Sequence, residues 1–373
     1  MENPFIVVGK IKPEYFCDRQ EESQRLIRQI TNGANTVIIS PRRLGKTGLI
    51  GYCFNNTEVQ ENYITIFIDI LRTSSLNELI YILGKKVFET IGTRSQRLMK
   101  LMVTTLKTLN GSFGYDPINN TPTFDIKLGD ITNPTYTLEE IFACIEQADK
   151  RCIIAIDEFQ QIVNYSEKNI EAILRTHIQH CSNANFIFAG SERHIMNEIF
   201  LDTARPFYNS AEMMMLKPIA ESKYKEFVQY HFKANGKKVE EEAIDLAYQC
   251  FEGNTYYLQK TFRTAFSETE RGQCVDKKQV TDIIDQMISD NNHRYGEVLS
   301  RLTLPQKELL YAVASEGRSR QITSGAFIRR HHLQSASSVQ AAAKKLLSYG
   351  LLSSENSEYY IDDQLMKLWL QQS

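Results

Sequence analysis

The sequence lacks the cysteine spacings that mark zinc sites and small disulfide-linked domains. Its seven cysteines form no C-x-x-C pair and stand at positions 17, 53, 144, 152, 181, 250 and 274. It also lacks an apolar run long enough to cross a bilayer, and the N-terminus has no basic start followed by a long apolar core. We therefore expect reduced, mostly buried thiols, a cytoplasmic location and no membrane partner.

A large excess of charge of either sign is also missing. The 43 Lys and Arg residues nearly balance the 45 Asp and Glu residues, which leaves a formal net charge of -2. Any contact with nucleic acid must therefore come from a local basic surface. There is no internal repeat or low-complexity tract, and 373 residues are enough for two or three domains with separate cores.

What the sequence does contain is an alternation of short apolar runs with helical patterns, which predicts an α/β fold. The runs that we interpret as strands cover residues 36–39, 64–70, 152–158 and 186–191. Continuous apolar runs of this kind are typical of strands covered on both faces, as in a parallel sheet. Residues 110–134 are instead rich in Gly, Asn, Pro and Thr, which indicates a peripheral, hairpin-like insertion.

The turn after the first predicted strand carries a phosphate-binding pattern. Residues 40–47 read Ser-Pro-Arg-Arg-Leu-Gly-Lys-Thr, and an apolar helix follows them. In a P-loop, backbone N–H groups at a helix N-terminus surround the β-phosphate, the lysine reaches the β- and γ-phosphates, and the threonine hydroxyl binds Mg²⁺. The pattern usually begins with glycine, so Ser40 requires a backbone conformation without positive φ. We predict that ATP and Mg²⁺ bind to Ser40, Pro41, Arg42, Arg43, Leu44, Gly45, Lys46, Thr47 and Gly48.

Two carboxylates follow the third predicted strand. Asp157 stands where a Walker B aspartate would bind Mg²⁺ together with Thr47, and Glu158 is placed to polarise the attacking water. Taken alone, this pair is as easily explained as a helix N-cap. Because a P-loop precedes the pair, we favour the functional interpretation and predict that Lys46 and Glu158 are catalytic.

Residues after the last core strand extend the predicted catalytic set. Ser191 is predicted to contact the γ-phosphate or the lytic water, although a simple turn serine explains it equally well. Arg205 is our preferred candidate, ahead of Arg193, for stabilising transition-state charge within the chain or across a subunit interface. Most arginines, however, are surface residues or ion-pair partners.

Three further arginines lie close to the nucleotide in this interpretation. Arg19 precedes the first predicted helix, near the expected place of the nucleotide base. The alternative is that this segment only starts the helix, with Asp18 as its N-cap. Arg42 and Arg43 lie in the loop itself. There they can reach phosphate, pair with an acidic neighbour or contact a partner subunit.

The second half of the chain has a different pattern. From Pro218 to about Leu299 the β signals give way to amphipathic helices, which predicts an all-α domain. After it, helices near residues 305–315, 323–331 and 335–349 precede two short strands. Three helices and a small hairpin predict a winged helix-turn-helix.

This last region contains a candidate nucleic-acid surface. Residues 317–354 include no Asp or Glu but several Lys and Arg, and the helix at 335–349 would be the recognition helix. The alternative is a winged helix used only for packing or for binding a protein. We predict contacts to double-stranded DNA from Arg329, Arg330, Ser337, Ser338, Gln340, Lys344 and Lys345.

These motifs, in this order, resemble those of the archaeal-type P-loop ATPases of the AAA+ and STAND group, including their bacterial members from Bacteroidetes. The matching residues are the P-loop, Asp157-Glu158-Phe159-Gln160 and Gly190-Ser191. The resemblance covers almost the whole chain. It implies an AAA+-like ATPase core over 1–216 with the insertion at 110–134, a helical lid over 217–299, and a winged helix over 300–373.

The chain departs from this family pattern at two points. Where relatives often have Tyr-Gly-Arg, this chain has Tyr208-Asn209-Ser210, so an arginine finger cannot be assigned there. Where relatives more often have Gly-Gly-x-Pro, it has Gly253-Asn254-Thr255-Tyr256.

We predict a slow ATPase that acts as a switch, in which the winged helix transmits the nucleotide state to DNA, a protein partner or a second copy of the chain. The alternative is a DNA-binding or protein-interaction module that holds nucleotide as a structural ligand with little turnover. A P-loop small-molecule kinase fits less well, because the paired carboxylates and the C-terminal domains favour an ATPase.

Overall fold

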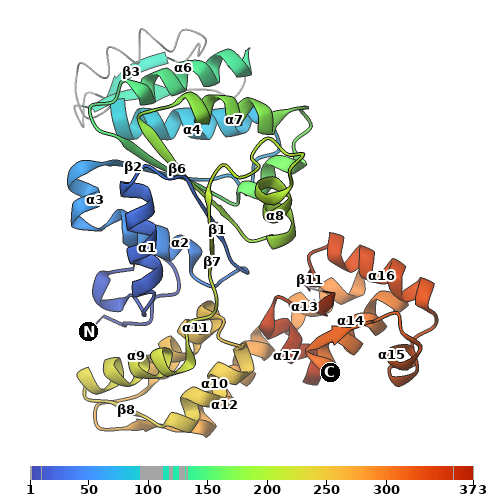
Figure 1. The fold of residues 1–373 in the computed structure, drawn as a ribbon. Helices are drawn as coiled ribbons and strands as arrows, with labels where there is room; N and C mark the ends of the chain where they lie inside the picture. Colours follow the sequence, from blue (N-terminus) through green and yellow to red (C-terminus); the bar gives the residue numbers. More distant parts are fainter. Residues whose placement is uncertain are drawn as a thin grey trace.

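The computed structural model describes residues 2–9, 11–92, 112–116, 121–125, 131, 133–355 and 357–372. Figure 1 shows an α/β unit at the top, a helical unit below it and a third unit at the side. The α/β unit is built on a five-stranded sheet in the order β2-β5-β6-β1-β7. All neighbouring strands in this sheet are parallel. The strands are β1 (Thr36–Ile39), β2 (Ile64–Asp69), β5 (Cys152–Asp157), β6 (Ala184–Gly190) and β7 (Glu212–Met215).

Helices cover both faces of this sheet, because its central strands are apolar on both sides. Fully buried side chains such as Ile38 and Ile187 pack against one layer of helices, and Ile154 and Phe186 pack against the other. The first layer consists of α1 (Gln20–Thr31), α2 (Lys46–Phe54) and α3 (Thr57–Asn62). The second layer consists of α4 (Leu76–Ile91), α6 (Pro134–Glu146), α7 (Ile170–His180) and α8 (Arg193–Leu201). The α/β core predicted from the sequence is therefore confirmed.

The structure corrects some element boundaries. Strand β7 was not predicted, because it is short, lies at the sheet edge and contains three methionines instead of β-branched residues. Helix α6 begins at Pro134, the last residue of the predicted insertion, and Asn133 caps it. Within the predicted insertion at 110–134, β3 (Ser112–Asp116) and β4 (Thr121–Asp125) pair antiparallel. Most of the remaining insertion lies outside the described residues.

The lid is a helical unit that follows β7. It contains α9 (Glu221–Ala234), α10 (Glu241–Phe251), α11 (Thr255–Glu268) and α12 (Lys277–Asp290). The next helix, α13 (Asn292–Ser300), lies with the third unit in Figure 1. Two short strands, β8 (Lys238–Val239) and β9 (Cys274–Val275), form a parallel pair that was not expected in an all-α region. The N-terminal segment joins this unit, because Phe5 is fully buried and lies edge-on to Phe227.

The C-terminal unit has the predicted winged-helix architecture. Its elements are α14 (Leu304–Glu316), β10 (Arg318–Arg320), α15 (Gly325–Arg330), α16 (Ala336–Ser348), β11 (Ser353–Glu355), β12 (Glu358–Tyr360) and α17 (Gln364–Gln372). The structure adds β10, which pairs with β12 and converts the predicted hairpin into a three-stranded sheet. Strand β11 begins directly after the apolar Leu351-Leu352 pair.

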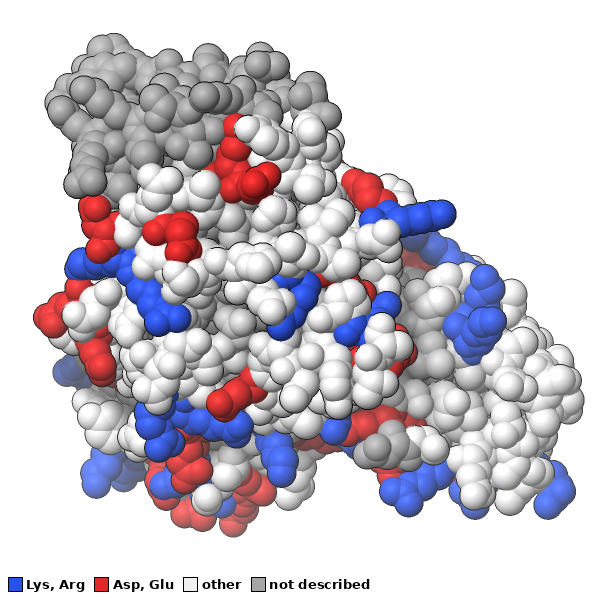
Figure 2. Space-filling view, turned by 45° about the horizontal axis from the view of Figure 1, so that its top comes forward, with Lys and Arg blue, Asp and Glu red and all other residues white. Residues whose placement is uncertain are grey.

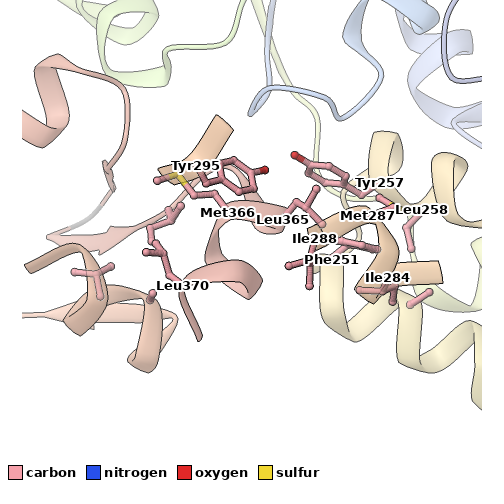
Figure 3. Packing of buried hydrophobic residues seen from close by; sticks show 14 of the residues in the cluster. Phe251, Tyr257, Leu258, Ile284, Met287, Ile288, Tyr295, Leu365, Met366 and Leu370 are labelled. Atoms are coloured by element: carbon pink, nitrogen blue, oxygen red, sulfur yellow. The ribbon is translucent and has the colours of Figure 1, made fainter. Parts of the chain in front are cut away.

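The lid and the winged helix share one hydrophobic core. Helix α17 contributes Leu365, which lies beside Phe251 and Ile288 of the lid, and Met366, which lies next to Tyr295 (Figure 3). The winged helix is therefore packed on the lid by buried apolar surface and is not attached by a linker alone.

All seven cysteines lie within the described residues and are free, and four of them are buried. In the part of the chain that the structure describes, no helix combines the length and apolar character needed to span a membrane.

Candidate nucleotide site

The loop after β1 has the backbone geometry of a phosphate-binding turn. The Ser40 N–H donates to the Gly190 carbonyl oxygen at 3.2 Å, so the loop starts beside the end of β6. Gly45 has a φ of +91°, and a Cβ added there would meet no protein atom within 4 Å. This glycine is therefore required by its left-handed backbone and not by crowding from protein atoms. Ser40 has no positive φ, as its side chain requires.

Lys46 and Thr47 begin helix α2 and face the carboxylates at the end of β5. The Thr47 hydroxyl donates to Asp157 Oδ2 at 2.6 Å. Lys46 Nζ lies 3.6 Å from Asp157 Oδ1 and 3.3 Å from Glu158 Oε1. Lys46 and Asp157 are 7% and 5% exposed, so this charge cluster is largely shielded from water. The structure therefore brings the predicted P-loop and Walker B residues together.

The donor set around Thr47 suits Mg²⁺. One hydroxyl and one carboxylate oxygen are hard ligands, which Mg²⁺ prefers, and this ion commonly takes its remaining ligands from phosphate and water. Asp69 ends β2 directly opposite Asp157 in the strand register. Asp69 was not predicted as a site residue, because its position opposite Asp157 depends on the order of the strands.

Glu158 is held in an unusual position by several partners. Its φ is +56°, a conformation that is rare for a residue with a side chain and that often occurs at functional sites. Its Oε2 accepts hydrogen bonds from Gln160 Nε2 at 2.6 Å and from the Ser191 hydroxyl at 2.7 Å. Burial alone would raise the pKa of the Glu158 carboxyl, but the Lys46 charge and these hydrogen bonds lower it below its ordinary value. Glu158 is therefore a carboxylate with a fixed orientation.

Gln160 also belongs to the site, although no role of its own was predicted for it from the sequence. It is 2% exposed, and its Nε2 lies within hydrogen-bonding distance of both Glu158 and Ser191. Gly190 makes room for it, because a Cβ at Gly190 would lie 2.6 Å from Gln160 Oε1. The Asp-Glu-x-Gln spacing was visible in the sequence, but the contact to Ser191 at the end of a neighbouring strand was not.

The two candidates for an arginine finger have other partners. Arg205 Nη1 lies 3.2 Å from Glu171 Oε1 at the start of α7. Arg193 forms an ion pair with Glu355 of the winged helix. No described contact joins either arginine to the P-loop, and the proposed catalytic role of Arg205 stays a prediction.

Arg19 stabilises the P-loop through hydrogen bonds to backbone carbonyl oxygens. It is 3% exposed, and its Nη2 donates to the carbonyl oxygens of Leu44 at 2.8 Å and Lys217 at 3.0 Å. Its Nη1 lies 3.0 Å from Glu22. Arg19 thus links α1, the P-loop and the entry to the lid, and any direct contact with nucleotide stays a prediction.

The two arginines inside the P-loop have different surroundings. Arg42 is exposed and lies 3.8 Å from Glu192. Arg43 has a φ of +68°, and its carbonyl oxygen accepts a hydrogen bond from the Tyr256 N–H of the lid at 3.1 Å. Its guanidinium bonds to the Tyr257 hydroxyl and lies 3.3 Å from Asp363. Of the alternatives open for Arg43, the structure therefore shows pairing with an acidic residue.

The predicted DNA-contacting residues lie mostly on the outside of the winged helix. On α16, Ser337, Gln340 and Lys344 are exposed and share one helical face by their spacing. Ser338 is only partly exposed, and its N–H donates to the Ser335 hydroxyl oxygen, which caps the start of the helix. On the face drawn in Figure 2, Lys and Arg of this lobe are spread among uncharged side chains and form no continuous patch.

Several of these basic side chains are already paired. Arg330 and His331 both contact Glu316, which precedes the acid-free segment. Arg318 and Arg320 contact Glu358, which follows it. Among the described residues, no ion pair involves Arg329, Lys344 or Lys345. The acid-free segment is therefore less basic in three dimensions than in sequence.

Comparison with known proteins agrees with this architecture. Residues 16–261 match a family model described as an ATPase domain predominantly from Archaea, and residues 293–372 match a probable winged helix domain. A search of curated proteins finds no match.

Solved structures resemble the chain over its whole length. A Walker-type ATPase of Pyrococcus abyssi is 18% identical with a TM-score of 0.68, and the match covers 99% of both chains. The ORC2 protein of Aeropyrum pernix, solved in ADPNP–ADP complexes, is 12% identical with a TM-score of 0.61, covering 99% of this chain and 98% of that one. The ORC1 protein of the same organism, in complex with DNA, is 12% identical with a TM-score of 0.52, covering 100% and 96%. At these identities the likeness shows the fold, whereas the family model spans well over half of the sequence. The chain therefore belongs to the family of ATPase domains found predominantly in Archaea, and it combines this ATPase domain, built on a parallel sheet, with a C-terminal winged helix.

Proposed function

We propose that this chain is a cytoplasmic, Mg²⁺-dependent ATPase that acts as a slow switch, whose nucleotide state controls binding of double-stranded DNA or a protein through the winged helix. The observation that carries this proposal is the hydrogen-bonded cluster at the ends of β1, β5 and β6. Its members come from three separate motifs and are Lys46, Thr47, Asp157, Glu158 and Ser191.

Nucleotide binding follows from the first half of this cluster. The N–H groups of the P-loop and the N-terminus of α2 would surround the phosphates, with Lys46 providing a positive charge. Thr47 and Asp157 would hold Mg²⁺, which supplies neutralisation of phosphate charge. Lys46 lies between two carboxylates in this structure, and a triphosphate would compete with them for its ammonium group.

Hydrolysis would depend on the second half. Glu158 is a carboxylate at neutral pH and can accept a hydrogen bond from an attacking water. Ser191 and Gln160 fix its orientation, which reduces the cost of arranging the reacting groups. Both hydrogen bonds are made to Glu158 Oε2. The other oxygen, Oε1, lies next to Lys46 and would therefore face the nucleotide.

The proposed output is the winged helix. The exposed α16 face supports a contact with DNA phosphates, as do Arg329, Lys344 and Lys345, which have no ion-pair partner among the described residues. The DNA complex of the Aeropyrum pernix ORC1 protein, which has the same overall fold, supports DNA as the partner by analogy.

A second function is favoured by the arginine contacts. Arg193 and Arg205 form ion pairs with Glu355 and Glu171, so neither is directed at the P-loop in this structure. A site without a transition-state arginine turns over slowly unless another subunit supplies one. The alternative is therefore an interaction module that holds ATP with little hydrolysis, or one that becomes active by self-association.

The test is ATP turnover by the purified chain with Mg²⁺, with and without double-stranded DNA, beside the Glu158→Gln variant. The switch predicts DNA-stimulated turnover that drops about 100-fold or more in the variant, because a general base contributes roughly this factor. ATP binding should survive the substitution, since Gln keeps the size and hydrogen-bonding capacity of the side chain. Equal turnover in both proteins would contradict the role of Glu158. ATP binding without turnover in either protein would support the nucleotide-holding module.

A further inference from the structure

A carboxylate of the winged helix lies beside the P-loop. Asp363 precedes α17 and caps it, with Oδ1 accepting from the Met366 N–H at 3.2 Å. The same Oδ1 accepts from the hydroxyls of Tyr257 at 2.5 Å and Tyr295 at 3.3 Å. In Figure 3 these two hydroxyls point toward each other above the start of α17. Asp363 therefore connects the lid with the winged helix at a fixed position.

The charge partner of this carboxylate belongs to the nucleotide site. Asp363 Oδ2 lies 3.3 Å from Arg43 Nη1, and the guanidinium also lies 5.0 Å from the Tyr256 ring centre and 5.2 Å from that of Tyr257. The pair is partly shielded, with side chains that are 35% and 23% exposed. Arg43 is the fourth residue of the P-loop, so its charge lies in the loop that would surround the phosphates.

The surrounding charges follow the same pattern. Arg193, two residues after Ser191, pairs with Glu355 of β11. Desolvation raises the pKa of the partly buried Asp362, while the Ser353 hydroxyl and the nearby Arg42 charge lower it. The loops around the nucleotide site thus supply basic groups to this interface, and the winged helix supplies acidic ones.

We propose that Asp363 competes with nucleotide phosphates for Arg43, so that docking of the winged helix on the P-loop weakens ATP binding and ATP weakens the docking. This inference rests on the proposed function, because it takes the P-loop as the ATP site. A triphosphate carries several negative charges and attracts the arginine more strongly than one carboxylate does. When Arg43 moves to phosphate, the described partners left to Asp363 are neutral donors, namely the Tyr257 and Tyr295 hydroxyls and the Met366 N–H.

The direction of the coupling must be the same from both sides. If ATP loosens the contact between Arg43 and Asp363, then removal of the carboxylate must tighten ATP binding by the corresponding factor. The ion pair therefore identifies the atoms through which the nucleotide site and the winged helix affect each other.

The test compares Asp363→Asn with the wild type by calorimetric titration of ATP with Mg²⁺. Asparagine caps helices as well as aspartate and still accepts hydrogen bonds from both tyrosines, so only the charge is removed. The matched control is Glu358→Gln, which removes a winged-helix carboxylate that pairs with Arg318 and Arg320 instead of with a P-loop residue. Thermal unfolding of each variant checks that the fold is kept.

We expect ATP to bind about two- to fivefold more tightly to Asp363→Asn than to the wild type, because a partly exposed ion pair contributes an effect of this size. The affinity of Glu358→Gln for ATP should equal that of the wild type. In an Arg43→Ala background, Asp363→Asn should have no further effect. Equal or weaker ATP binding by Asp363→Asn, with ATP still bound by the wild type, overturns this inference and leaves the ATP site intact. Failure of the wild type to bind ATP overturns the site and the inference together.

Discussion

The nucleotide site and the outer face of the winged helix both depend on charged side chains, but these are arranged differently. At the nucleotide site, Lys46, Asp157 and Glu158 are mostly buried and held by one another. On the winged helix, Arg320 and Arg330 are exposed and paired with acids that lie outside the acid-free segment. Charges at the ends of buried strands have positions determined by the sheet, whereas surface charges are neutralised by whichever partner the fold brings near. A basic run in sequence is therefore weaker evidence for a binding site than a motif at a strand end.

The largest expected effect is at the nucleotide site. Lys46→Ala should weaken ATP binding by about two orders of magnitude, because charge-assisted hydrogen bonds contribute roughly 1.5–3 kcal/mol each. Titration with ATP and Mg²⁺ measures this effect. The matched control is Lys86→Ala on α4, which removes only a surface pair with Glu89. Tight ATP binding by Lys46→Ala would contradict the assignment of the P-loop.

A smaller effect is expected from the buried glutamine that holds Glu158. Gln160→Leu should lower kcat about tenfold with little change in KM, because it removes two hydrogen bonds that orient the base without touching the phosphate contacts. The neighbouring Gln161→Leu is the control, since Gln161 donates to the Thr73 carbonyl oxygen instead. Equal kcat values for the two variants would show that Gln160 does not position Glu158.

The basic residues of the winged helix fall into two groups, those without a described ion-pair partner and those paired with an acidic residue. Replacing Arg329, Lys344 and Lys345 with alanine should lower the salt dependence of DNA binding by up to about three counterions, because each interaction with a phosphate releases roughly 0.9 counterions. Replacing the paired Arg318, Arg320 and Arg330 should lower it by less. The measurement is the DNA affinity of both triple variants and the wild type over a series of low to moderate salt concentrations. An unchanged slope in both triple variants would favour protein binding over DNA binding.

The smallest effect concerns pH. The pKa of Glu158 is below its ordinary value of 4.5, so its interactions stabilise the fold above that pH and are lost as pH falls through the folded pKa. The wild type should therefore exceed Glu158→Gln in unfolding free energy by about 0.5–1 kcal/mol at neutral pH. Denaturant unfolding at neutral pH and near pH 3.5 measures this difference. A difference that grows on acidification would contradict the lowered pKa.

The difference between strand ends and surface positions also explains what the sequence could predict. Strands β1, β2 and β5 were found because their apolar β-branched runs end in polar motifs, and parallel strands bring those ends to one edge. Strand β7 was missed because an exposed edge strand needs no such run.

Contacts between distant segments were not predictable. Gln160 meets Ser191 only through the order of the strands, and Asp363 meets Arg43 across 320 residues. The pairing of Arg318 and Arg320 with Glu358 likewise depends on β10 joining β12. In each case the sequence shows the residue type, and tertiary packing supplies the partner.

The central claim is that the nucleotide state controls the winged helix. It is tested most directly by measuring the affinity of Glu158→Gln for double-stranded DNA at one salt concentration, without nucleotide, with ADP and with ATP plus Mg²⁺. We predict that ATP raises the affinity about fivefold, a coupling within the usual range for linked sites. The same dissociation constant in all three conditions, in a protein that binds both ATP and DNA, would contradict the claim.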